Sequence, residues 1–497
     1  MGTYITFPEL LVWLPFVAGI LCFFTGKEKA AKTLAFLASI VVFVVSLTSR
    51  CYSDEQYFSY NNVVYYWLKY LGSSIFFSLD ALSRLLTLLT ALAYPLIIAA
   101  TWRRKIKNAP AFFGLMLLAQ SGIMGVFTAQ DALLFYFFWE LALIPVYFLS
   151  SKWGDERRIQ ATFKFFVYTF AGSLLMLVGI IYVYLHTAPR TFSDGTYAAH
   201  SFLLSSFYNA SLSGIEQTWL FWLFFVAFAI KMPVFPFHSW QPDVYDQAPA
   251  PVTMVLSGIM VKMGLYGVLR WLLPVVPLAS VKFAHVVMVL SVIGIIYASC
   301  IALVQDNLKK LIAFSSIAHI GLMSAAIFSF NELSIKGMMF QMLAHGISVI
   351  GMWMVAELLE RQVNVRKMSE LGGIAKKAPA LTIFAVIIGL ANLALPLTNS
   401  FVGEFMMLSG LFSVNKWYAA IATLSVILVS VYTLKMLQKI FYGNTNAATD
   451  HVKDISIDEK VALSIVVVGI IITGVFPQPV FDLTSDVANW ILMKLTY

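Results

Sequence analysis

Long runs of apolar residues alternate with short polar connections along most of the chain. A run of roughly 20 apolar residues can cross the hydrocarbon core of a bilayer as an α-helix. Fourteen runs meet this description, and each predicts one membrane-spanning helix. They cover approximately residues 4–24, 33–49, 78–100, 109–128, 131–150, 160–186, 217–237, 250–273, 283–304, 311–329, 334–358, 379–411, 417–441 and 459–476. The pattern therefore predicts an all-α polytopic membrane protein with about 14 transmembrane helices.

Two of the runs contain proline close to an ionisable residue. Lys231 is followed by Pro233 and Pro236, and Pro396 precedes Glu404 by eight positions. Proline removes a backbone donor and kinks or ends a helix. Ordinary proline kinks would give the same pattern, but breaks beside buried charges are typical of transporters with a site near mid-membrane. We therefore expect two discontinuous helices.

The composition agrees with a chain that is covered mainly by lipid. Of its 497 residues, 60% are hydrophobic and 12% are charged, whereas soluble domains have about 45–50% apolar and about 25% charged residues. The net charge of +8 could suggest a nucleic-acid partner. The basic residues lie in short loops between apolar runs and not on one basic face, so nucleic acid is not expected.

The loops carry an uneven distribution of positive charge. With 14 crossings, 21 of the 33 Lys and Arg residues fall on one side of the membrane and eight on the other. The remaining four lie inside runs: Arg84, Lys164, Lys231 and Lys262. Because cytoplasmic loops are enriched in Lys and Arg, the first side is expected to be cytoplasmic. Both termini would then lie on the outer side, with the protein in a bacterial inner membrane.

The cysteines give no sign of a metal or redox centre. Cys22, Cys51 and Cys300 are far apart and form no C-x-x-C pair. Iron–sulfur clusters and structural zinc sites need closely spaced ligands. No cofactor is therefore expected in this chain.

Six ionisable residues inside the runs are the candidates for function. They are Glu140, Lys231, Lys262, His319, His345 and Glu404. A charged side chain at mid-bilayer costs roughly 2.5–3.5 kcal/mol on insertion scales, so such residues normally face the bundle interior. Any one of them could be an ion pair between helices or a residue reaching the interface. Acids, bases and histidines together on separate helices favour a proton relay.

The residue types suit proton transfer. A lysine beside a movable carboxylate releases its proton more readily when the carboxylate moves away, and histidine titrates near neutral pH. For His319 and His345 singly, a plain helix-to-helix hydrogen bond is an equally good interpretation. Haem ligation by the pair is disfavoured, because neither histidine lies in a haem motif.

Several motifs around these residues resemble one membrane-protein family. KMPVFPFHSWQPD, followed by APAPVTMVLSGIMVKMGLYGVLR, resembles the central signature of the antiporter-like subunits of respiratory complex I. NLKKLIAFSSIAHIGL, QMLAHGIS and LPLTNSFVGEF resemble further blocks of the same family. The likeness covers roughly residues 75–445. Glu404, where most members have lysine, is similar to the M-type branch.

The resemblance implies a division of the chain into four parts. Residues 1–108 would hold helices 1–3, and 442–497 a cytoplasmic loop, helix 14 and the C-terminal segment. Between them, 109–273 and 274–441 would be two inverted five-helix repeats, each with a broken helix. These two repeats are called the first and second halves below.

The resemblance also implies a role for each candidate residue. Glu140 would pair with Lys231, Lys262 would be the central proton carrier, and Glu404 the terminal site. His319 and His345 would form the relay between Lys262 and Glu404.

One segment departs from the family pattern. After HSW the family usually has L-P-D-A-H-x-E-A-P, whereas this chain has QPDVYDQAPAP. Gln241 stands in place of leucine, Tyr245 in place of histidine and Gln247 in place of glutamate, with Asp246 beside it. The roles of residues in this loop therefore cannot be carried over.

The function implied is a proton-translocating subunit in the membrane arm of NADH:quinone oxidoreductase. Its partners would be the lipid bilayer and other membrane-arm subunits, including homologous antiporter-like ones. Flavin, iron–sulfur clusters and quinone would belong to the partner subunits. The alternatives are an Mrp-type sodium/proton antiporter subunit, a membrane-bound hydrogenase subunit and a passive scaffold without ion movement.

Overall fold

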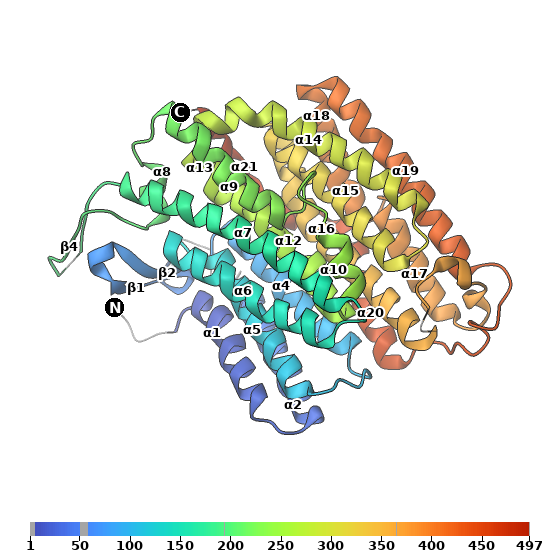
Figure 1. The fold of residues 1–497 in the computed structure, drawn as a ribbon. Coiled ribbons are helices and arrows are strands. Elements are labelled where there is room, and N and C mark those ends of the chain that lie inside the picture. Colours follow the sequence, from blue (N-terminus) through green and yellow to red (C-terminus); the bar gives the residue numbers. More distant parts are fainter. Residues whose placement is uncertain (1–4, 50–57, 193, 364, 497) are drawn as a thin grey trace.

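The computed structural model describes residues 5–49, 58–192, 194–363 and 365–496. Helices of many lengths lie side by side in one bundle, with α16 in its interior (Figure 1). The N-terminal and first-half helices are α1 (Phe7–Phe23), α2 (Glu28–Thr48), α4 (Ala81–Ala100), α5 (Ala109–Thr128), α6 (Ala132–Trp153), α7 (Arg158–Leu185) and α9 (Gly214–Lys231). Arg50 and Cys51 lie outside the described residues.

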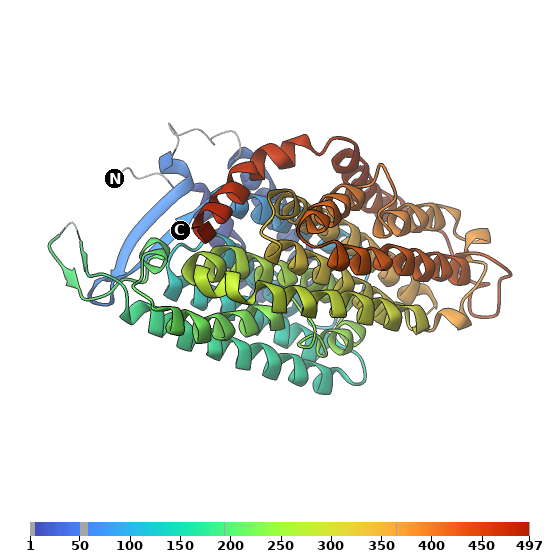
Figure 2. The same cartoon turned by 90° about the horizontal axis from the view of Figure 1, so that it is seen from above.

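The later helices follow the remaining apolar runs. They are α14 (Pro277–Val304), α15 (Leu308–Phe328), α16 (Glu332–Val363), α17 (Pro379–Asn392), α18 (Asn399–Val414), α19 (Lys416–Phe441), α20 (Ile457–Val475) and α21 (Gln478–Thr496). α21 is bent by 66° from α20 and lies along the side of the bundle, where it contacts α4 and α16 (Figure 2).

The expected number of 14 crossings is not confirmed. Among the described residues, eleven helices are long and apolar enough to cross a membrane, or twelve if α20 and α21 form one bent span. α1 and α17 are apolar but have only 17 and 14 residues. Every predicted run nevertheless corresponds to a helix or to a broken pair of helices.

The run at 250–273 forms one fully buried helical stretch with two changes of winding. It consists of α11 (Ala250–Val255), the π-helical segment η4 (Leu256–Met260), α12 (Val261–Gly267), a second π-helical segment η5 (Val268–Leu272) and α13 (Leu273–Val275). π-helical turns are rare and are frequent at functional sites. Here η4 ends two residues before Lys262.

Both helix breaks occur where the prolines predict them. α9 ends at Lys231, and the chain then passes through Pro233 and Pro236 to the short helix α10 (Gln241–Gln247). Pro396 lies between α17 and α18. In both places the missing amide hydrogen prevents a continuous helix.

Short extramembrane elements close one end of the bundle. Strands β1 (Asn62–Leu68) and β2 (Ser73–Ser78) form an antiparallel hairpin, and β3 (Arg190–Thr191) pairs with β4 (Tyr197–Ala198). The short segments α3 (Phe58–Asn61), η3 (Lys69–Leu71) and α8 (Leu204–Tyr208) lie in the same loops as the strands. In contrast, η6 (Met368–Glu370) and η7 (Ile374–Lys376) belong to the loop after α16, which contacts the loop before α15 at the other end. The all-α prediction did not include these hairpins, because their residues lie between the apolar runs.

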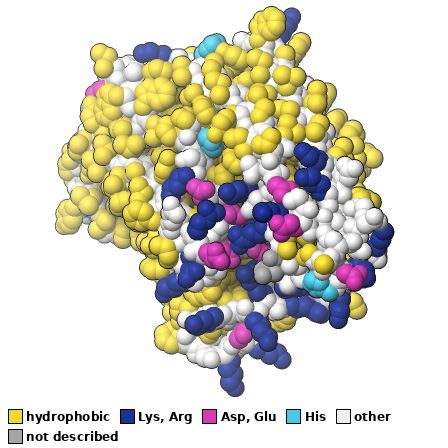
Figure 3. All heavy atoms as spheres, turned by 45° about the vertical axis from the view of Figure 1, so that its right-hand side comes forward, with side chains coloured by type: hydrophobic (Ala, Val, Ile, Leu, Met, Phe, Trp, Pro, Cys, Tyr) yellow, Lys and Arg dark blue, Asp and Glu magenta, His cyan; other side chains and the backbone are white. Residues whose placement is uncertain are grey.

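The loops that the charge count assigns to one side lie together in the structure. Lys32 donates to the carbonyls of Trp102 and Arg104, and Arg103 pairs with Asp458 at 2.7 Å. Figure 3 shows Lys, Arg, Asp and Glu side chains gathered on one part of the surface, next to a broad hydrophobic region. The polar and apolar surfaces are thus separated, as a bilayer requires.

Candidate functional site

Lys262 and His345 form the centre of the buried polar site. Lys262 Nζ lies 2.8 Å from His345 Nδ1 and donates to the carbonyl of Ser257 at 3.0 Å. Ser257 belongs to η4, whose π-helical winding precedes the lysine. Lys262 is fully buried and His345 is 4% exposed. Helices α12 and α16 therefore meet through a direct contact between a base and an imidazole.

His319 and Glu404 form a second direct contact. His319 Nδ1 on α15 lies 3.0 Å from Glu404 Oε1 on α18. Gln341 Nε2 donates to the same carboxylate oxygen at 3.5 Å. Both partners are more than nine-tenths buried. The carboxylate is thus held by an imidazole and an amide inside the bundle and not by lipid-facing groups.

The two histidines bring these contacts into one line. The centroids of the His319 and His345 rings are 5.5 Å apart. Ser316 Oγ lies 3.2 Å from His345 Nε2, one turn before His319 on α15. His319 Nε2 has no hydrogen-bond partner among the described residues. The direct contacts Lys262–His345 and His319–Glu404 are thus brought together by the neighbouring imidazole rings, with side chains from four helices.

The break between α17 and α18 positions Glu404. Within it Ala394 and Leu397 adopt left-handed backbone conformations, with φ of 55° and 75°. Residues other than glycine rarely adopt such conformations. Asn399, the first residue of α18, accepts from Ser348 Oγ at 3.2 Å and donates to the carbonyl of Ala344 at 3.3 Å. These bonds fix the start of α18 against α16, one residue away from His345.

Glu140 and Lys231 lie apart from this line. Lys231 is 3% exposed, and its ammonium group lies 5.5 Å from the centroid of the Trp139 ring. Neither Lys231 Nζ nor Glu140 Oε1 has a hydrogen-bond partner in the described part of the chain. Glu140 acts on Lys231 through the electrostatic field and not through a direct bond. The six candidates therefore form a connected group of four and a separate pair.

Further neutral polar residues, which the sequence did not single out, form a buried hydrogen-bonded group between α15, α17 and α19. Tyr432 on α19 donates to Ser315 Oγ at 2.9 Å, and Asn392 Nδ2 donates to Ser315 Oγ at 3.2 Å and to Thr433 Oγ1 at 3.3 Å. Single hydroxyls and amides are ordinary in membrane helices. The one possible signal was Asn392 itself, a polar residue at the end of the apolar helix α17.

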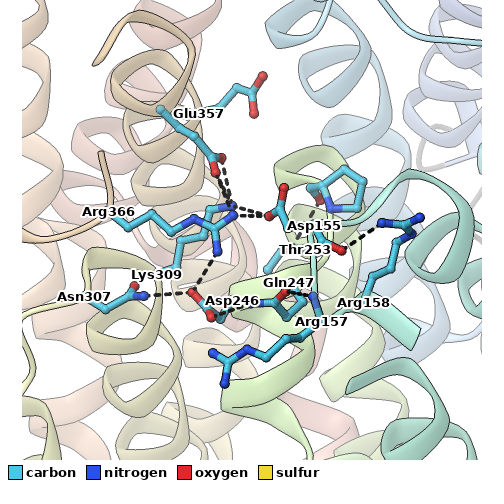
Figure 4. Close-up of polar contacts among 12 residues, drawn as sticks. Asp155, Arg157, Arg158, Asp246, Gln247, Thr253, Asn307, Lys309, Glu357 and Arg366 are labelled. Carbon is cyan, nitrogen blue, oxygen red and sulfur yellow. Dashed lines mark hydrogen bonds and ion pairs between the residues drawn. The ribbon is translucent and has the colours of Figure 1, made fainter. Parts of the chain in front are cut away.

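A cluster of ion pairs lies at the end of the bundle that carries the basic loops. Arg366 pairs with Asp155, with Glu360 at 3.4 Å and with Asp246 at 3.6 Å. Lys309 pairs with Glu360 at 2.8 Å. Figure 4 shows Asp155, Asp246, Lys309 and Arg366 converging from loops and helices that are far apart in the sequence.

Helix α10, whose sequence QPDVYDQ differs from the family pattern, takes part in this cluster. Asp246 accepts from Asn307 at 2.8 Å and from Gln247 at 2.8 Å, and Gln247 accepts from the backbone of Arg157 at 2.9 Å. A polar cavity of about 190 Å³ adjoins this helix. Its lining is Arg157, Gln160, Ala161, Lys164, Asp243, Asp246 and Gln247.

The chain is similar to known membrane proteins over most of its length. Residues 129–430 match the family described as NADH:quinone oxidoreductase/Mrp antiporter, TM. The NADH-quinone oxidoreductase subunit M of Rickettsia typhi is 36% identical over 98% of each chain. The subunit M of Escherichia coli strain K12 is 34% identical over 98% of this chain and 99% of that protein.

Solved structures share the fold. A chain of respiratory complex I from Thermus thermophilus has a TM-score of 0.89 and 28% identity, over 98% of this chain and 99% of that one. A chain of the Mrp complex from Dietzia is similar in fold alone, with a TM-score of 0.84 and 19% identity, over 98% of this chain and 99% of that one. With the family match, the full-length relatives and this fold in agreement, the chain belongs to the NADH:quinone oxidoreductase/Mrp antiporter family of membrane subunits.

Proposed function

We propose that this chain is the M-type proton-translocating subunit in the membrane arm of an NADH:quinone oxidoreductase. The observation that carries the proposal is the buried line Lys262–His345–His319–Glu404, in which acid, base and imidazole groups from α12, α16, α15 and α18 lie within short reach. The full-length relatives named subunit M support the choice of complex.

Proton transfer along this line needs only the groups present. Lys262 gives its proton to His345, whose ring passes a proton from its other nitrogen toward His319. Ser316 can bridge this step, because a hydroxyl both accepts and donates. His319 then delivers a proton to Glu404, and the line is ready to be reloaded at Lys262. Each transfer moves one proton and leaves the total charge of donor and acceptor unchanged.

Glu140 and Lys231 would regulate proton transfer along this line of residues. Because no direct bond joins them, a small movement of α6 against α9 would change the field at Lys231. Opposite charges within about 4–6 Å stabilise the ionised forms. A signal from partner subunits that alters this separation would therefore decide when Lys262 releases its proton.

The setting of the chain follows from the same proposal. The partners would be the other membrane-arm subunits, including homologous antiporter-like ones, and flavin, iron–sulfur clusters and quinone would be held by partner subunits. The membrane would be a bacterial inner membrane, with the end that carries the basic loops in the cytoplasm and both termini outside. The division at residues 108, 273 and 441 remains a prediction.

Alanine variants of Lys231, Lys262 and Glu404 test the proposal in the native complex. We expect each complex to assemble but to lose most of its coupled quinone reduction and of its acidification of the outer side. Removing a positioned proton-transfer group commonly costs about 10²-fold or more in rate. The measurements are quinone reduction and pH-dye quenching in sealed vesicles that contain the purified complex.

Lys416→Ala is the matched control, since Lys416 begins α19 and lies outside the line. It should reduce quinone and pump as the unaltered complex does. Wild-type rates in all three test variants would refute the relay. Full quinone reduction without pumping in the double variant Lys262→Ala/Glu404→Ala would show that the line moves protons without controlling electron transfer.

A further inference from the structure

Helix α10 has two polar faces that differ in their surroundings. Asp243, Asp246 and Gln247 line the cavity described above. Gln241 and Tyr245, four residues apart and hence on a common helical face, are both fully buried. The second face is therefore polar although neither solvent nor that cavity reaches it.

Four polar atoms at this buried face lack a protein partner. Both amide atoms of Gln241, the hydroxyl of Tyr245 and the indole nitrogen of Trp353 form no hydrogen bond with any described residue. Trp353, on α16, packs edge-on against Tyr245 with ring centroids 5.9 Å apart. The buried face of α10 therefore meets a polar side chain of α16. Buried polar groups without a partner are costly, and in native proteins ordered water usually satisfies them.

The chemistry of the three side chains suits water. The Gln241 amide lies close enough to the Tyr245 hydroxyl to influence it as a hydrogen-bonding group, yet the two do not reach the geometry of a direct hydrogen bond. Polar groups held slightly beyond direct reach are a common setting for a bridging water. Together they offer acceptors (the amide oxygen and the hydroxyl) and donors (the amide nitrogen, the hydroxyl and the indole), which meets the two to four partners that a buried water requires.

The buried face lies between the charged cluster and the relay. Tyr245 directly precedes Asp246, which pairs with Arg366. The indole of Trp240 donates at 2.9 Å to the carbonyl of Ile230, the neighbour of Lys231. Trp353 follows His345 by eight residues on the same helix, roughly 12 Å along its axis at 1.5 Å per residue.

We propose that Gln241, Tyr245 and Trp353 form a buried site for ordered water, and that this water passes protons between the charged cluster around Asp246 and the buried lysines. Each transfer is a hop in which a water or the Tyr245 hydroxyl accepts one proton and donates another, so no net charge is left behind. The water site stands on the unpartnered atoms alone. Its part in proton transfer rests on the proposed function.

The first test is a density map. We expect a cryo-EM map of the purified complex, at a resolution that shows ordered water, to contain density within hydrogen-bond distance of Tyr245 Oη and the Gln241 amide. The density should disappear in the double variant Gln241→Leu/Tyr245→Phe. A dry site in the unaltered complex overturns the proposal.

The second test measures pumping in vesicles. We expect Gln241→Leu/Tyr245→Phe to pump several-fold more slowly than the unaltered complex. Tyr245→His alone should keep most of the rate, because imidazole can also accept and donate a proton. Tyr197→Phe, at an exposed tyrosine of β4, is the matched control.

The two proposals fail separately. Wild-type pumping in Gln241→Leu/Tyr245→Phe, with Lys262→Ala still inactive, would overturn the water path and leave the relay intact. Wild-type pumping in Lys262→Ala would overturn the relay itself, while the density map would still decide whether the water site exists.

Discussion

Asp131 is a buried carboxylate that fastens the β1–β2 hairpin to the start of α6. It accepts from Ser73 Oγ at 3.0 Å and from the backbone of Ser74 at 2.9 Å. As the N-cap of α6 it also accepts from the backbone of Leu133 and Leu134. Burial raises the pKa of Asp131 to about 6, against four hydrogen bonds that favour the ionised form. Its charge is therefore costly in the folded state although its contacts are good.

A pH dependence of stability follows from this residue. Because its folded pKa lies above the unfolded value of 3.8, Asp131 contributes stability that is complete below about pH 4 and is lost as pH rises through about 6. The loss is about 3 kcal/mol at roughly 1.4 kcal/mol per pKa unit. Thermal unfolding in detergent from pH 4 to 8 should therefore show the unaltered chain losing stability relative to Asp131→Asn.

Comparing the two proteins removes the effect of every other titrating group. The exposed Asp482 provides the control variant Asp482→Asn, whose curve should run parallel to that of the unaltered chain. Parallel curves for Asp131→Asn as well would contradict the assignment.

The residues alone marked six buried candidates, whereas their grouping was implied only by the family resemblance. Lys262, His345 and Glu404 stand out because a charge or imidazole inside an apolar run is costly. Without the resemblance, residue type and spacing do not separate Glu140 and Lys231 from them, since helix rotation and register are set by packing. Ser316, which contacts His345, is one serine among many and carries no such signal.

At the level of elements, the break between α17 and α18 is held from outside by α20. A Cβ atom on Gly474 would lie 2.5 Å from the carbonyl oxygen of Leu397 and 2.7 Å from the amide nitrogen of Asn399. These are backbone atoms of the break and cannot rotate away. Only glycine allows α20 to approach the break so closely.

Gly474→Ala should therefore displace the start of α18. We expect a loss of about 1–3 kcal/mol in stability, the usual cost of overpacking, and slower proton pumping because Glu404 follows on the same helix. Gly469→Ala is the control on α20, since its Cβ would meet only Ile347 at 3.7 Å, an ordinary contact. The two variants are compared by thermal unfolding in detergent and by pumping in vesicles. Equal stability and equal pumping in the two variants would mean that the break between α17 and α18 can shift to accommodate a Cβ atom at residue 474.

The prolines allowed both breaks to be predicted, whereas two other elements were missed. The π-helical segments within 250–275 flank α12, which packs closely against α9: a Cβ on Gly264 would lie 2.7 Å from the carbonyl of Phe228. No local sequence rule marks such a fit. No strand was predicted at the β1–β2 hairpin, because its apolar and aromatic residues do not alternate clearly with polar ones.

At the scale of the whole molecule, the ion pairs around Arg366 join the two predicted halves. Asp155 and Asp246 belong to the first half, whereas Glu360, Lys309 and Arg366 belong to the second. α16 carries both Glu360 and His345, and α10 follows the break after Lys231. A movement of one half against the other must therefore rearrange this cluster.

Charge counting predicted that these residues share one side of the membrane, and their contacts confirm that they lie at one end of the bundle. It could not predict which acid meets which base. That depends on how loops from distant parts of the sequence are brought together by helix packing. The side-by-side position of α10 and the loop after α16 is a property of the assembled fold.

Arg366→Gln tests how strongly the cluster holds the halves together. Removing one partner of a fully buried ion pair costs about 3–5 kcal/mol, but Arg366 has a side-chain exposure of 30%, so solvent reduces the expected loss to about 1–2 kcal/mol. The neighbouring variant Lys367→Gln breaks a pair whose side chains are 67% and 51% exposed and should cost less than about 0.5 kcal/mol. Thermal unfolding of both variants in low and high salt gives the comparison. If Arg366→Gln is no less stable than Lys367→Gln, helix packing alone joins the halves; a larger loss that shrinks in high salt would show that these charges contribute.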